Sequence, residues 1–161
     1  MNGLLTRLLA CSASLILVTA CSTLPSKYIE KAEPGVTLTS LAAAPETYQG
    51  KTVILGGVVV DQQQQQQGQR LWLHVKNRPL DKDYRPHRPT INEGPEAGYY
   101  WVVVPDASLL PPKWKQWARV TVVGRVMDQT ETRPTAVPTS EPVLSLVFMR
   151  GWTMGNAQGK G

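Results

Sequence analysis

The sequence predicts an all-β fold, because three features count against a helical bundle and favour short strands. Thirteen glycines and thirteen prolines in 161 residues interrupt helices and favour turns. Five segments are rich in β-branched and aromatic residues, and in two of them, Arg70–Lys76 and Ala118–Met127, apolar and polar residues alternate. Glycines lie midway along two of the segments, where a sheet can bend to close on itself.

The predicted strands follow one another at turns that contain Gly, Pro or Gln. They are Thr52–Val60, Arg70–Lys76, Tyr99–Val104, Ala118–Met127 and Val143–Arg150. A small sheet that closes on itself has few exposed edges through which it could aggregate. We therefore expect a five-stranded OB-like barrel, with an open β-sandwich as the alternative.

Alternation along the second and fourth strands predicts which side chains face the core. Every other residue is apolar in both strands, which is the period of a strand with one buried face. The expected core residues are Leu71, Leu73, Val75, Val120, Val122 and Val126.

Two features of the first strand predict local irregularities. Gly56 and Gly57 lie in its middle and indicate either a bulge or a tight bend. The six consecutive glutamines Gln62–Gln67 follow the strand and predict an elongated hairpin loop.

Two helical turns are expected outside the sheet. Thr37–Ala44 places Leu38 and Leu41 on one face of such a turn. Trp114 and Trp117 lie three residues apart, which favours a turn that closes one end of the barrel with both rings buried. The alternative is that the two rings lie at the depth of lipid headgroups as interfacial anchors.

Residues 1–20 have the parts of an export signal. Arg7 supplies the positive charge, and Leu8–Val18 forms an apolar stretch that is shorter than the roughly 20 residues needed to cross a bilayer. The signal ends at Val18–Cys21, which resembles the lipobox of bacterial lipoproteins. This resemblance implies cleavage between Ala20 and Cys21, with diacylglycerol on the Cys21 thiol and an acyl group on its new amine. The alternative is an ordinary secretory signal.

The lipobox also determines the fate of both cysteines and the expected location. Cys11 leaves with the signal and the Cys21 sulfur carries lipid, so the mature chain has no thiol for a disulfide, a metal site or a nucleophile. In lipoproteins of this type Asp after the lipidated cysteine retains the protein in the inner membrane. Ser22 stands there instead, which implies the outer membrane, with the domain facing the periplasm.

The chain divides into four predicted parts. They are a lipoprotein signal peptide (1–20), the lipidated cysteine with a flexible tether (21–35), the β-barrel domain (36–152) and a disordered tail (153–161). The tether assignment depends on its Pro, Ser and charged residues, which show no clear period.

Four motifs, taken in order, resemble the Slp family of bacterial outer-membrane lipoproteins, the starvation-inducible type. The most characteristic is the Pro-Leu-Asp step at residues 79–81. The motifs are Leu55–Val59, Leu71–Pro86, Ala118–Val126 and Glu141–Trp152. The resemblance implies a peripheral lipoprotein of the cell envelope without an established enzymatic activity, for which stabilisation of the envelope under starvation or stress is expected.

The sequence offers little for catalysis, so we expect no enzyme, cofactor or metal. His74, His87, Asp81 and Asp83 could form an acid–base or metal site, but basic residues in the same stretch oppose a cation, and a solvated loop of mixed charge is favoured. The sequence also lacks a Gly-x-Ser-x-Gly nucleophile elbow and a Gly-rich phosphate loop.

A net charge of +5 and a basic stretch suggest contact with an anionic surface. The candidate residues are Lys76, Arg78, Lys82, Arg85 and Arg88. Anionic lipid headgroups beside the anchor or an acidic envelope polymer are the expected partners, while an exported protein meets little nucleic acid. A loop that contacts only solvent is nevertheless favoured over either of these contacts.

A second expectation is a binding module for an envelope protein or a glycan. Its candidate face consists of Trp72, His74, Trp101, Arg119 and Arg125. Partner binding predicts a contiguous exposed aromatic patch, whereas a structural, membrane-tethered role predicts scattered and buried aromatic rings.

Overall fold

A computed structural model describes residues 24–65, 70–88, 94–128, 138 and 140–153 of the chain. The predicted signal peptide, Cys21 and all but the first residue of the predicted tail lie outside the described residues. Within the described part of the chain, none of the helices is long and apolar enough to cross a membrane.

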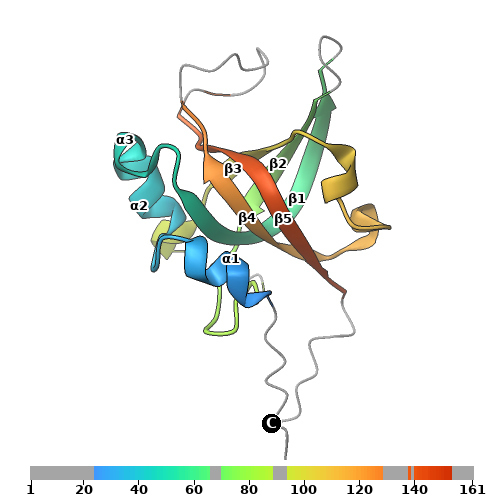
Figure 1. Ribbon diagram of the computed structural model, residues 1–161, viewed down its shortest axis with the longest axis horizontal. Coiled ribbons are helices and arrows are strands. Elements are labelled where there is room, and N and C mark those ends of the chain that lie inside the picture. The colour runs from blue at the N-terminus through green and yellow to red at the C-terminus, as the bar shows by residue number, and fades with distance from the viewer. Residues whose placement is uncertain (1–23, 66–69, 89–93, 129–137, 139, 154–161) are drawn as a thin grey trace, which may run out of the picture.

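Five strands close into one ring, as the sequence predicts. They are β1 (Thr52–Gln64), β2 (Leu71–Asn77), β3 (Tyr99–Val104), β4 (Arg119–Val126) and β5 (Val143–Trp152). Their order around the barrel is β1-β2-β3-β5-β4, with β4 pairing back onto β1. All pairs are antiparallel except β3 with β5. Figure 1 shows the strands curled around one another, with α1, α2 and α3 along one side.

Short helices connect and cover the strands. Three α-helices precede the sheet: α1 (Ser26–Lys31), α2 (Leu38–Ala43) and α3 (Pro45–Tyr48). Three 3₁₀ turns lie between β2 and β4: η1 (Gly94–Glu96), η2 (Ala107–Leu109) and η3 (Trp114–Gln116). The helical turn predicted over residues 37–44 is confirmed as α2, which begins with a capping box between Thr37 and Ser40 and buries Leu38 and Leu41.

The barrel interior is apolar, and it contains the side chains that alternation selects. Five of the six expected core residues are buried there and the sixth, Leu71, packs against them. Trp114 and Trp117 pack against this interior cluster, but both are half-buried, whereas the sequence predicts buried rings. The Trp117 ring occupies the space beside Gly151, where any side chain would collide with it.

Strand β1 bends at its glycine pair, because it pairs with two different strands. Residues 52–57 pair with β4 and residues 57–64 pair with β2. A Cβ at Gly56 would lie 2.5 Å from the Arg78 carbonyl oxygen, and one at Gly57 would collide with Val75. The bend is therefore at the glycines, whereas the shift in register between β1 and β2 lies further on, between Val59 and Asp61.

The glutamine run differs from its prediction. Gln62, Gln63 and Gln64 belong to β1 and pair with Leu73, Trp72 and Leu71 of β2. The strand continues because backbone hydrogen bonds do not depend on side-chain polarity, and the outer part of a hairpin tolerates polar residues. The connection between β1 and β2 is therefore shorter than the sequence suggests.

The predicted flexible tether also differs from the structure from residue 24 onward. Leu24 is fully buried, and it packs with Ile54 and Val123 on the outer face of the barrel. Helix α1 follows directly, and Glu33 donates its backbone N–H to the Thr52 carbonyl at 2.8 Å. Tyr28, Ile29 and Ala32 lie four, five and eight residues after Leu24, which is a helical spacing hidden by the charged residues between them.

We expect Gly56→Ala to lower the free energy of unfolding by about 1–3 kcal/mol, because the added methyl group has no room at the bend. Urea unfolding followed by circular dichroism measures the change. Val60→Ala is the control, because Val60 is half-exposed on the same strand. If the two variants are equally stable, the close approach at Gly56 is not a constraint.

Candidate functional site

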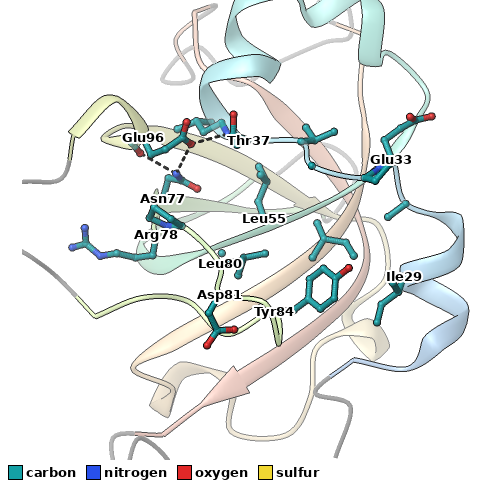
Figure 2. A pocket seen from close by; sticks show the side chains of 18 residues that line it. Ile29, Glu33, Thr37, Leu55, Asn77, Arg78, Leu80, Asp81, Tyr84 and Glu96 are labelled. Atoms are coloured by element: carbon teal, nitrogen blue, oxygen red, sulfur yellow. Dashed lines mark hydrogen bonds between the residues drawn. The ribbon is translucent and has the colours of Figure 1, made fainter. Parts of the chain in front are cut away.

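An apolar cavity of about 330 Å³ lies between α1, the segment that leads into α2, β1 and the loop after β2 (Figure 2). Its volume falls in the range of small-ligand sites. The apolar side chains that line it are Ile29, Ala32, Val36, Leu38, Ile54, Leu55, Leu80 and Tyr84. Several of them also contact the cluster around Leu24, so the cavity adjoins the docked N-terminal segment.

Polar groups at one end of the cavity are bonded to one another. The Glu96 carboxylate accepts the Leu38 backbone N–H at 3.1 Å, and the Asn77 side chain donates to the Glu96 carbonyl at 2.9 Å (Figure 2). Asn77 is buried. These bonds tie η1 to the start of α2 and to the end of β2, so this rim supports the cavity structurally.

The loop after β2 is folded around Asp81. One carboxylate oxygen of Asp81 accepts the backbone N–H groups of Asp83 and Arg85, each at 2.8 Å. The loop closes where Leu80 pairs with Pro86. The Pro-Leu-Asp motif therefore has a local explanation: its aspartate satisfies backbone donors that the turn would leave unpaired.

Tyr84 connects this loop to the cavity wall. Its φ of 59° is the left-handed conformation, which is uncommon for a residue with a large side chain. Thr121, which is buried on β4, donates its hydroxyl to the Tyr84 carbonyl at 2.7 Å. Figure 2 shows the Tyr84 ring turned toward Ile29 of α1. The loop conformation thus places an aromatic wall against the docked N-terminal helix.

His74 lies apart from Asp81, Asp83 and His87, the other residues considered for the acid–base or metal site that the sequence disfavours. His74 contacts the Glu141 carboxylate at 2.9 Å and stacks on Trp101, on a different strand pair from the Asp81 loop. Asp81 binds backbone N–H groups, and His87 is exposed. Among the described residues, no three acidic, histidine or cysteine side chains gather as metal ligands would.

The predicted binding face is divided between two places. Trp72 and Trp101 are 1% and 2% exposed, in a cluster with Val103 and Val143 on the outer side of the sheet. Trp101 donates its indole N–H to Glu141 at 2.6 Å. The two rings therefore do not form the exposed aromatic patch that partner binding requires.

The arginines of that face lie at opposite ends of β4. Arg119 and Arg125 are six residues apart, which is about 20 Å along a strand. Arg125 is exposed and lies opposite Thr52. Arg119 lies opposite Trp152 of β5 and donates to the Pro86 carbonyl.

The five residues predicted to contact headgroups also lie in different environments. Arg78 is only 7% exposed and lines the cavity, so it is not a surface contact, and Lys76 is half-buried on β2. Lys82, Arg85 and Arg88 are exposed on the loop.

A basic site that the sequence does not reveal lies around Trp152. The Arg85 and Arg150 guanidinium carbons are 5.5 and 4.8 Å from the centroid of the Trp152 ring. Arg119 lies opposite Trp152, and the pKa of its guanidinium is lowered, chiefly by burial and then by the positive charge of Arg88. We call Arg85, Arg88, Arg119 and Arg150 the arginine cluster. No local motif marks it, because its members come from three separate segments.

The sequence model of the outer membrane lipoprotein Slp family matches residues 18–159. The match includes the end of the predicted signal peptide, Cys21 and every described residue, and it confirms the resemblance drawn from the four motifs. No curated protein shows a significant match.

We expect Asp81→Ala to lower the free energy of unfolding by about 2 kcal/mol, because it removes a charged acceptor from two backbone N–H groups. Urea unfolding measures this loss. Asp83→Ala is the matched control: its carboxylate contacts Lys82 on the exposed surface at 3.2 Å, and its removal should change stability by less than about 1 kcal/mol. Equal losses in the two variants would contradict the role given to Asp81.

Proposed function

The chain belongs to the outer membrane lipoprotein Slp family, and we propose that it is held in that membrane by lipid on Cys21, with its domain facing the periplasm. We further propose that its role there is non-catalytic: it stabilises the envelope under starvation or stress. Ser22, the residue after the lipidated cysteine, supports the outer-membrane location.

The observation that carries this proposal is the burial of Leu24. Only three residue steps separate Leu24 from Cys21, and they span at most about 11 Å when fully extended. A lipid at Cys21 would therefore hold the barrel directly at the bilayer surface instead of at the end of a long tether. Each buried methylene of the lipid contributes about 0.8 kcal/mol, so an anchor of several chains keeps the domain there.

The burial of the aromatic rings supports the structural role over recognition of an envelope protein or glycan. Trp72 and Trp101 are both inaccessible. At the rim of the cavity, Glu96 bonds to Leu38 and Asn77 within the protein, so these polar groups support the fold.

We expect the native protein to need detergent for its release from membranes, with a mature N-terminal peptide that carries the mass of an N-acyl diacylglyceryl group on Cys21. Cys21→Ser should remove both properties, because serine has no thiol to accept diacylglycerol. Membrane fractionation and mass spectrometry measure the two outcomes. Cys11→Ser is the control and should behave as the native chain. An unlipidated native protein that washes off membranes in buffer would refute the proposal.

The cavity supports a second candidate function, the binding of a small apolar ligand. Its lining is mostly apolar, and polar side chains such as Asn77, Asp81 and Glu33 lie around its edge, which is typical of such sites. We expect the neutral probe N-phenyl-1-naphthylamine to fluoresce on binding, and Val36→Trp to abolish this by filling the cavity. Val60→Trp makes the same change at an exposed position and should leave binding intact. Equal binding by both variants would exclude the cavity as the ligand site.

A further inference from the structure

We propose that the arginine cluster around Trp152 is a docking site for the phosphate groups of anionic phospholipids. The inference rests on the proposed lipid anchor and extends it, because it specifies which face of the barrel meets the bilayer. The contacts with headgroups are assigned to the arginine cluster, which forms only in the folded chain, and not to the continuous basic stretch of residues 76–88.

Trp152 holds the site in place. The residue is 6% exposed, and its indole N–H donates to the Thr121 hydroxyl at 3.0 Å. Arg85 and Arg150 both lie within cation–π distance of the ring. The guanidinium groups are therefore positioned by a fixed aromatic surface, while the side chains of Arg85 and Arg150 stay exposed.

The cluster concentrates positive charge. The positive charge of Arg88 contributes to the lowered pKa of the Arg119 guanidinium, after burial, and the Asp81 carboxylate opposes this effect. One Asp81 oxygen is already bonded to two backbone N–H groups. In the part of the chain that the structure describes, the guanidinium groups of Arg85 and Arg150 form no ion pair with a carboxylate. Such a concentration of like charge favours an anionic ligand.

The cluster lies where the lipid would hold the chain. Phe148, Arg150 and Trp152 point to the outer side of β5, and Phe148 stacks on Tyr28 of α1 with ring centroids 4.7 Å apart. Helix α1 begins two residues after Leu24. Figure 1 shows the start of α1 and the end of β5 at the same lower end of the molecule. An anchor at Cys21 would therefore bring this end to the headgroups.

Phosphate fits the chemistry of the cluster. Arginine binds phosphate oxygens through paired N–H groups, and Arg85 and Arg150 present theirs at the surface. A bilayer offers many phosphates in one plane, and an anchor nearby makes the second contact intramolecular, so weak individual contacts suffice. These features favour phospholipid over an acidic polysaccharide.

The test uses the processed chain from residue 21 with Cys21→Ser, which retains every described residue and has no lipid. We expect it to sediment with phosphatidylglycerol vesicles at low salt and to be released from them at high salt. It should not sediment with vesicles made of phosphatidylcholine. The double variant Arg85→Gln/Arg150→Gln should bind about 30-fold more weakly. Arg85→Lys/Arg150→Lys keeps the charge and should retain most of the binding.

The matched control is Arg70→Gln/Arg125→Gln. It removes the same two charges from exposed arginines that line a different hollow, and it should bind like the parent. Circular dichroism checks that each variant is folded. The proposal fails if the two glutamine double variants bind equally, if the parent does not bind anionic vesicles, or if a soluble acidic polysaccharide binds and the vesicles do not. Lipidation of native Cys21 is measured separately, so failure of the anchor and failure of the docking site are distinguishable.

Discussion

The double pairing of β1 is the constraint on which the rest of the structure depends. At Gly57 the strand leaves β4 and joins β2, and the carbonyl of the preceding Gly56 accepts hydrogen bonds from the Arg78 backbone N–H and the buried Tyr100 hydroxyl, each at 3.1 Å. Burial raises the pKa of the Tyr100 phenol, so the group remains a donor.

This crossing point also positions the functional elements. Because Arg78 is fixed against Gly56, the loop that follows it begins at a set place and direction. Asp81 folds that loop, and Tyr84 closes the cavity against α1. The same loop brings Arg85 to Trp152, so the cavity and the arginine cluster both depend on the bend in β1.

The sequence predicts the inner face of the barrel well and its outer face poorly. Alternation identifies residues such as Leu73 and Val122, because one side of each strand must be apolar to build the interior. Alternation does not say whether the other side meets water. Trp72 and Thr121 are on that other side and are nevertheless buried, because neighbouring segments cover them.

The candidate site was harder to predict, because its parts are distant in the sequence. Leu24 reads as part of a polar linker until Ile54 and Val123 are placed beside it. Arg150 joins the arginine cluster only because the register of β5 on β4 places it near Trp152, where the loop after β2 also brings Arg85. The Pro-Leu-Asp motif could be recognised in the sequence, but its physical purpose required the backbone geometry around Asp81.

The position of β5 in the ring has a consequence for the order of events after export. β5 comes after the other four strands in the chain, yet it lies between β3 and β4, so the ring cannot close until that strand has emerged on the far side of the membrane. Contacts of such long sequence separation form slowly compared with local ones. On the proposed export route the N-terminal end crosses first, so the proposed acylation of Cys21 would have time to occur while the barrel is still open.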